Sequence, residues 1–162
     1  MAEPVQVTQF NDAGCPWGYS ANPAFRVLEW RYGAQLEWRL VLIGLTNVAQ
    51  EYVDRGYTPL RSAEGYARRF RRFGMPLAPN PRARIVGTGR SCRAIAAVRL
   101  QAPGREWAAF RALQFAFFTT CQHALDNRRK NAYDFVYFAV LQIKTGDRKK
   151  LRIIRPILRH QH

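Results

Sequence analysis

A strand–helix–strand pattern within the first 45 residues constrains the fold more than any other feature. Residues 5–10 (Val-Gln-Val-Thr-Gln-Phe) are β-prone and lead into turn-forming residues, which predicts a strand followed by a loop. Residues 16–32 carry apolar side chains at helical spacing and end at Gly33, a common helix terminator. Residues 36–43 alternate and then become wholly apolar, as in a central strand. We therefore predict a βαβ unit with parallel strands, and an α/β fold.

The region from about residue 48 to 118 is predicted to be helical. Apolar spacing predicts helices over residues 62–73, 90–101 and 105–118. The first of these helices ends at Gly74, and three prolines in the next seven residues predict an irregular loop. The last two helices are separated by Ala102-Pro103-Gly104.

Cys15 lies at the predicted junction between the first strand and the helix, directly before Pro16. A proline in the first turn loses no helical hydrogen bond, because the first-turn amides have no partner within the helix. These amides and the positive end of the helix dipole favour a thiolate over a thiol, and the thiolate is the attacking form of cysteine. Trp17 offers a flat apolar wall beside the sulfur. We therefore predict that Cys15 is a nucleophile rather than a buried structural cysteine.

Three segments carry a family resemblance: residues 11–20 (Asn-Asp-Ala-Gly-Cys-Pro-Trp-Gly-Tyr-Ser), 29–33 (Glu-Trp-Arg-Tyr-Gly) and 38–41 (Trp-Arg-Leu-Val). They resemble the DsbA-like family of thioredoxin-fold proteins, and within it the cytoplasmic bacterial branch of FrnE-like proteins and 2-hydroxychromene-2-carboxylate isomerases. The resemblance covers residues 5 to about 120. It implies a thioredoxin fold with a helical subdomain inserted after the second strand.

The resemblance also implies roles for individual residues. Cys15 is then the catalytic cysteine of a motif completed by Pro16, Trp17 and Gly18. The loop from Phe73 to Pro76 is similar to one that faces the active site in the relatives. The residues expected to contact the substrate are Tyr19, Met75 and Pro76.

Gly18 departs from the dithiol members, which have a second cysteine at that place. Without it, a mixed disulfide on Cys15 cannot be resolved inside the motif. We expect no bound cofactor, and a low-molecular-weight thiol such as glutathione or mycothiol as co-substrate. Cys92 is the other candidate for resolving the mixed disulfide, but Ile95 and Ala96 share its helical face, which favours a position in the core.

The second departure begins after Thr120, where the strand that a cis-proline introduces in the family has no counterpart. Residues 121–162 contain every lysine of the chain, whereas all basic residues before them are arginine. We therefore predict a thioredoxin-type domain over residues 1–120, with a βαβ core (4–45) and a helical insert (48–118). A basic tail follows, with a possible β-hairpin over residues 133–154. In one interpretation this tail completes the sheet. In the other it is an unrelated extension or the product of a shifted reading frame, and the sheet is then incomplete.

The net charge of +15 raises nucleic acid as an alternative partner, because clustered bases bind phosphate without sequence preference. Residues 68–73 (Arg-Arg-Phe-Arg-Arg-Phe) interleave arginines with aromatics, but those aromatics have the spacing of a core-facing helix stripe. No nucleic-acid-binding motif accompanies them, so we expect no specific nucleic-acid partner. The three cysteines and three histidines have no metal-site spacing, and we expect no metal. No apolar run of about 18 residues and no secretory signal are present, which predicts a cytoplasmic protein without a membrane partner.

The sequence therefore predicts a monothiol thiol–disulfide oxidoreductase that acts on a protein or small-molecule disulfide or other electrophile. Two alternatives remain open. One is a glutathione- or mycothiol-dependent isomerase or transferase on the same scaffold. The other is a truncated, inactive domain or a nonspecific nucleic-acid binder. The oligomeric state is not predicted.

Overall fold

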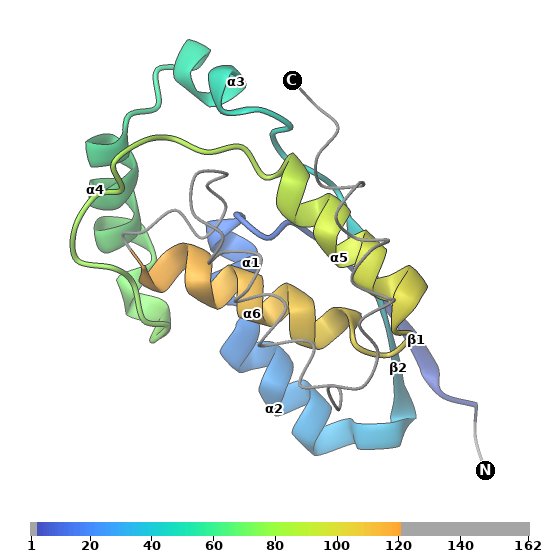
Figure 1. The fold of residues 1–162 in the computed structure, drawn as a ribbon. Coiled ribbons are helices and arrows are strands. Elements are labelled where there is room, and N and C mark those ends of the chain that lie inside the picture. Colours follow the sequence, from blue (N-terminus) through green and yellow to red (C-terminus); the bar gives the residue numbers. More distant parts are fainter. Residues whose placement is uncertain (1–2, 121–162) are drawn as a thin grey trace, which may run out of the picture.

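The computed structural model describes residues 3–120, which form two strands and a set of helices around them (Figure 1). In chain order the elements are β1 (Val5–Asn11), α1 (Pro16–Ser20), α2 (Asn22–Tyr32), the 3₁₀ turn η1 (Gly33–Gln35), β2 (Leu36–Leu42), α3 (Ala49–Asp54), α4 (Pro59–Arg69), the 3₁₀ turn η2 (Arg71–Phe73), α5 (Gly89–Gln101) and α6 (Glu106–Thr119). The predicted hairpin of residues 133–154 lies outside the described residues. Within residues 3–120 no helix is long and apolar enough to span a bilayer.

The two strands form the parallel pair that the sequence predicts. Their register runs from Val5 opposite Leu36 to Asn11 opposite Leu42. Because side chains alternate along a strand, one face of the pair carries Trp38 and Leu40, which pack against the helices. Asn11, the last residue of β1, and the loop after it therefore lie at one end of the face of the strand pair that packs against the helices.

The predicted helix over residues 16–32 is two helices, α1 and α2, so that prediction is wrong in its continuity. Pro23 is the physical reason, because it lacks the N–H that would bond the carbonyl of Tyr19 four residues earlier, and its ring crowds that carbonyl. The apolar stripe of α2 is also more exposed than a core-facing helix would be. No residue of α2 is buried, and Phe25 makes its ring contact with Trp38 of β2.

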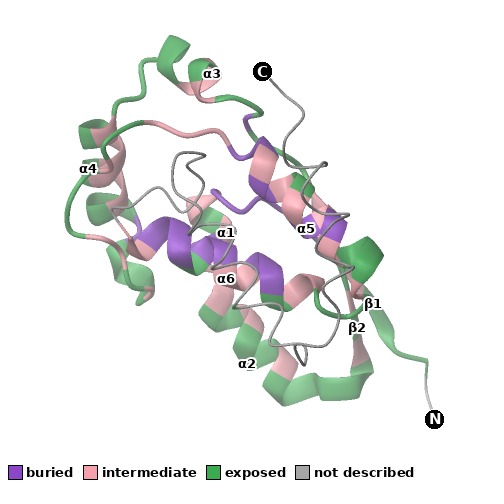
Figure 2. Ribbon diagram, in the orientation of Figure 1, coloured by how far each residue is buried: buried purple, intermediate pink, exposed green. Residues whose placement is uncertain are grey.

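The core lies where α6 crosses the middle of the molecule, between α2 and α5 (Figures 1 and 2). One cluster joins the strands to the last two helices through Leu40, Ile95, Phe110 and Leu113. A second cluster lies toward α4 and contains Tyr19, Phe117 and Phe118. Since Tyr19 follows Cys15 by four residues, the second cluster fixes α1, and the cysteine at its start, to the C-terminal half of α6.

The helices after β2 follow the sequence prediction closely. The helix predicted over residues 62–73 begins earlier, at Pro59, because Thr58 caps it by accepting the Arg61 amide at 3.1 Å. It ends as the 3₁₀ turn η2 and stops at Gly74, whose φ of 80° suits glycine. The segment between η2 and α5 has no regular structure and runs past α4 to the start of α5 (Figure 1). It is joined to α6 where the Ala78 amide donates to the Phe118 carbonyl at 2.7 Å. The chain therefore has an α/β architecture in which, within residues 3–120, a two-stranded parallel sheet is followed by a series of helices.

Candidate active site

Cys15 ends a tight turn that leads from β1 into α1. Its amide donates to the Asp12 carbonyl at 3.1 Å, and the Gly14 amide donates to the Asp12 carboxylate at 2.6 Å. A side chain of Asp that bonds the amide two residues ahead stabilises such a turn. A Cβ on Gly14 would lie 2.5 Å from a methyl carbon of Thr88, so the tight packing requires glycine there. The local sequence thus fixes the backbone that carries the thiol.

Asp12 is the organising residue of this turn, and it is fully buried. Its carboxylate oxygens accept hydrogen bonds from four donors on three parts of the chain: the Gly14 amide (2.6 Å), the Leu45 amide (2.9 Å), the Thr88 hydroxyl (2.7 Å) and the Cys92 thiol (3.5 Å). Its carbonyl also accepts from Gln114 of α6 at 3.3 Å. A buried carboxylate is tolerated only with such partners. Asp12 therefore ties the cysteine turn to the loop after β2, to the start of α5 and to α6.

The Cys15 sulfur occupies the N-cap position of α1 and is half-buried. Its Sγ accepts a hydrogen bond from the Gly18 amide at 3.4 Å. This bond fixes the orientation of the sulfur relative to the first turn of α1. The arrangement presents a partly accessible sulfur, aligned by a backbone donor, that can attack an electrophile.

Gly18 lies against Asn11, which is itself buried. A Cβ on Gly18 would overlap Oδ1 of Asn11 and lie 2.5 Å from its Cγ. The Asn11 side chain is held there because Oδ1 accepts the Asp12 amide at 2.8 Å. Position 18, where a dithiol motif has its second cysteine, is occupied by glycine, and the packing against Asn11 leaves no room for a larger side chain.

The other residues of the predicted site surround Cys15 through α1. Trp17 is 58% exposed and packs edge-on against Phe70, with ring centroids 4.7 Å apart, and against Phe73 at 6.3 Å. Tyr19 is buried, and its hydroxyl donates to the Pro76 carbonyl at 2.7 Å. Burial raises the pKa of Tyr19 to about 12, so this donor keeps its proton.

Met75 packs against the second core cluster beside Tyr19, whereas Pro76 is exposed. The structure therefore brings the predicted loop from Phe73 to Pro76 next to the cysteine motif.

Two tyrosines of the helical insertion complete the surroundings of Cys15. Burial raises the pKa of Tyr52, the neighbouring Thr46 side chain opposes that effect, and Asp12 raises the pKa further. Burial also raises the pKa of Tyr66, Arg82 lowers it, and Cys15 contributes to raising it. Both phenols therefore remain protonated donors at neutral pH.

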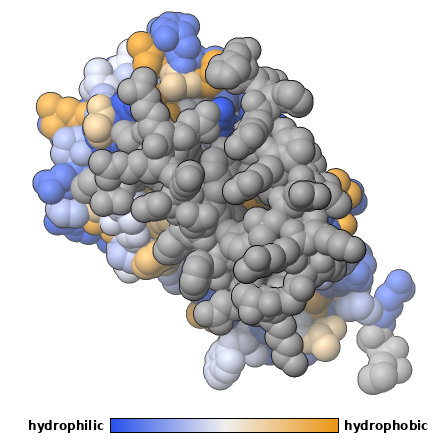
Figure 3. Space-filling model, in the orientation of Figure 1, coloured by the Kyte–Doolittle hydropathy of each residue, from blue (hydrophilic) through white to orange (hydrophobic). Residues whose placement is uncertain are grey.

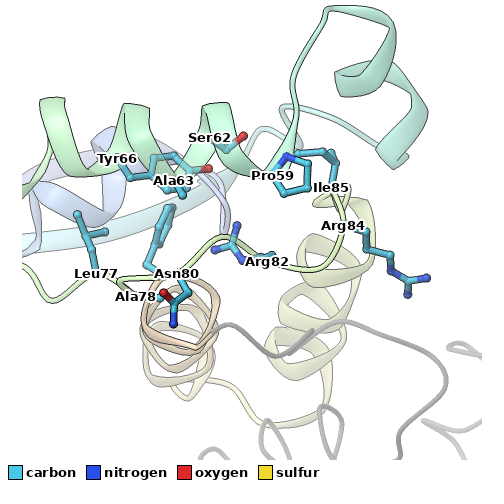
Figure 4. A pocket seen from close by; sticks show the side chains of 11 residues that line it. Pro59, Ser62, Ala63, Tyr66, Leu77, Ala78, Asn80, Arg82, Arg84 and Ile85 are labelled. Atoms are coloured by element: carbon cyan, nitrogen blue, oxygen red, sulfur yellow. The ribbon is translucent and has the colours of Figure 1, made fainter.

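A hollow of about 380 Å³, open to solvent, lies between α4, the loop after η2 and the end of α6 (Figure 4). Tyr66 of α4 and Phe118 of α6 line it, and Arg82 extends into it from the loop, while Arg84 points away. The Arg82 guanidinium stacks on the ring of Phe117 at 3.8 Å and donates to the Phe117 carbonyl. Because Tyr66 belongs both to this hollow and to the surroundings of Cys15, the two features adjoin.

Cys92 does not fill the apolar core, so that interpretation is corrected. It is half-buried, and its thiol donates to the Asp12 carboxylate at 3.5 Å, while Ile95 of the same helix is fully buried. Burial, together with the charge of Asp12, raises the pKa of Cys92 to about 12. A thiol held in this way stays protonated at neutral pH and is a poor nucleophile.

Five residues near Cys15 are not predicted by the sequence patterns: Asn11, Asp12, Thr88, Tyr52 and Tyr66. The sequence marks Asn11 and Asp12 only as turn-forming residues. The position of Asn11 and Asp12 in the sequence could have indicated their role. Short polar side chains between a strand and a helix often hydrogen-bond the backbone at the start of that helix. Nothing local marks Thr88 or Tyr52, which reach the site through the fold.

Neither the family models nor the curated proteins include a match to this chain. Its structure is similar to a crystal structure described as a "putative protein disulfide isomerase from Nitrosomonas europaea". The two share 19% sequence identity at a TM-score of 0.60, over 97% of this chain and 78% of the other. At that identity the likeness establishes the fold alone, which is a thioredoxin fold with a helical insertion.

Proposed function

We propose that this protein catalyses thiol–disulfide exchange through the single cysteine Cys15. The observation that carries the proposal is the Cys15 sulfur itself, half-buried at the start of α1 and hydrogen-bonded by the Gly18 amide at 3.4 Å. The similarity to a structure described as a disulfide isomerase supports the same class of chemistry on the same fold.

The first step is attack of the Cys15 thiolate on one sulfur of a substrate disulfide. A bond forms between Cys15 and that sulfur, the substrate disulfide breaks, and the other substrate sulfur leaves as a thiolate that takes up a proton. The second step is attack by an external thiolate on the mixed disulfide, which returns Cys15 and leaves a new external disulfide. The number of disulfides is unchanged over the cycle, so no further oxidant or reductant is needed.

The external thiol in this proposal is a low-molecular-weight thiol such as glutathione or mycothiol. Gly18 cannot be replaced by a resolving cysteine without displacing Asn11, and the Cys92 thiol is engaged by Asp12. Low-molecular-weight thiols keep the cytoplasm reducing, and we propose the cytoplasm as the setting.

The test is the reaction of the protein with 4,4′-dithiodipyridine, an uncharged disulfide whose leaving thiol absorbs light. We expect a mixed disulfide on Cys15 at neutral pH, located by peptide mass spectrometry, and none on Cys92. Cys15→Ser should abolish the fast phase of thiol release, and Cys92→Ser, which keeps a donor for Asp12, serves as the matched control.

Equal labelling of Cys15 and Cys92, or a fast phase that survives Cys15→Ser, contradicts the proposal. Peptide mapping is required because Cys121 is also present in the chain.

A further inference from the structure

The segment from Arg68 to Phe73 is not used by the exchange chemistry, yet it adjoins the cysteine motif. It places four arginines around Phe70 and Phe73 at the end of α4 and in η2: Arg68, Arg69, Arg71 and Arg72. All four are exposed. We refer to these six residues as the arginine–aromatic cluster.

The cluster is joined to the active site through Trp17. Trp17 contacts both aromatic rings of the cluster, and it stands two residues after Cys15. Phe70 is buried beneath it, while Phe73 is 38% exposed and lies 4.9 Å below the guanidinium of Arg72. Trp17 and Phe73 therefore form an exposed apolar surface, bordered by cations, that begins two residues after Cys15.

The charge of this cluster is not balanced by the residues around it. Within residues 3–120 none of the four arginines forms an ion pair, and Glu64 is the single acidic residue of α4. The helix dipole favours Arg68 and Arg69 in the last turn of α4, but like charges this close together repel each other. An acidic partner would remove that repulsion. On the α4 side of the molecule, hydrophilic residues surround smaller hydrophobic spots (Figure 3).

We infer that the arginine–aromatic cluster is the docking surface for an acidic peptide segment that carries the reactive disulfide to Cys15. This inference rests on the proposed exchange function and specifies its substrate class. An apolar side chain of the peptide packs on Trp17 and Phe73, and flanking carboxylates pair with the arginines. A nucleic acid matches the same charge, but it offers no disulfide to the adjacent sulfur, so the position of the cluster favours a peptide.

The experiment compares three short peptides, each with one cysteine activated as a thiopyridyl disulfide and flanked by glutamate, glutamine or lysine residues. The rate of thiopyridone release is measured for the full chain, for R71Q/R72Q and for R31Q/R39Q. The last variant removes two charges from α2 and β2, at the opposite end of the molecule (Figure 1). It controls for the net charge of +15, which attracts any acidic peptide.

We expect the glutamate peptide to react faster than the glutamine peptide, and the lysine peptide to react slowest. R71Q/R72Q should lower the glutamate-to-glutamine rate ratio by roughly 2- to 30-fold, the range expected for two exposed ion pairs. R31Q/R39Q should keep most of the ratio. Raising the salt to about 0.5 M should reduce it, because exposed charges are then screened.

The inference is overturned if the three peptides react at equal rates. It is also overturned if R71Q/R72Q leaves the glutamate-to-glutamine rate ratio unchanged, or if R71Q/R72Q and R31Q/R39Q lower that ratio equally. Inhibition by a single-stranded oligonucleotide without any peptide charge preference also overturns it and assigns the cluster to nucleic acid. The proposed function fails separately, if Cys15 does not react even with uncharged 4,4′-dithiodipyridine.

Discussion

The contact between Gly18 and Asn11 gives a quantitative test of how the active site is packed. Gly18→Ala adds one methyl group, which would overlap Oδ1 of Asn11 and lie 2.5 Å from its Cγ. Overpacking of this kind costs about 1–3 kcal/mol. The backbone of Gly18 is not left-handed, so alanine also gains about 0.5–1 kcal/mol of helix propensity. The net destabilisation is therefore expected to lie between about 0 and 2.5 kcal/mol.

Asn11→Ala removes the obstruction, and in that background Gly18→Ala should become stabilising by about 0.5–1 kcal/mol. The two substitutions are therefore coupled by about 1–3 kcal/mol. Urea unfolding of the four proteins, followed by circular dichroism with reductant present, measures this coupling. Gly65→Ala is the matched control, because nothing lies within 4 Å of the added methyl group and a gain of about 0.5–1 kcal/mol is expected. A coupling below about 0.5 kcal/mol, or a stabilising Gly18→Ala in the native background, refutes this account of the site.

Three further predictions follow from the buried polar groups. The pKa of Cys92 is raised from its ordinary value near 9 to about 12, so the folded state keeps a proton that the unfolded state loses, and stability should fall as pH rises from about 9 to 12. Cys92→Ser should reduce that fall in urea unfolding measured at several pH values, whereas an unchanged slope contradicts the assignment. Tyr19→Phe removes the hydrogen bond to the Pro76 carbonyl and should lower the free energy of unfolding by about 0.5–1.5 kcal/mol. Amide hydrogen exchange in the loop from Phe73 to Pro76 should become faster. Unchanged exchange would mean that this bond does not hold the loop. Asp12→Ala leaves several buried donors without an acceptor and should lower the free energy of unfolding by at least about 3 kcal/mol. Labelling of Cys15 should also become slower. A loss of stability below about 1 kcal/mol contradicts the central position of Asp12.

Local sequence patterns were sufficient for the turn that carries Cys15 and for the strand β2. The apolar alternation of residues 36–43 and the turn before Cys15 predicted β2 and the junction correctly, because both depend on neighbours in the chain. The break between α1 and α2 was also visible in principle, since Pro23 removes one helical hydrogen bond. The prediction failed there because the apolar spacing on either side of the break was treated as one continuous helix.

The supporting interactions of the site could not be predicted from local patterns. Asp12 has the sequence environment of a turn residue, and its role depends on donors 33 to 102 positions away: Leu45, Thr88, Cys92 and Gln114. The contact of Trp17 with Phe70, which links the cysteine motif to the arginine–aromatic cluster, also joins residues that are far apart in the sequence. Such contacts depend on how the helices pack against the strands, and periodicity predicts only which face of a helix is apolar.

The central claim is that Cys15 acts alone and that an external thiol releases it. The most direct measurement is the rate at which a preformed Cys15 mixed disulfide is released at several glutathione concentrations. We predict a release rate proportional to the glutathione concentration and the same in Cys92→Ser. Release that proceeds without added thiol, or that disappears in Cys92→Ser, would show an internal resolving cysteine and contradict the account.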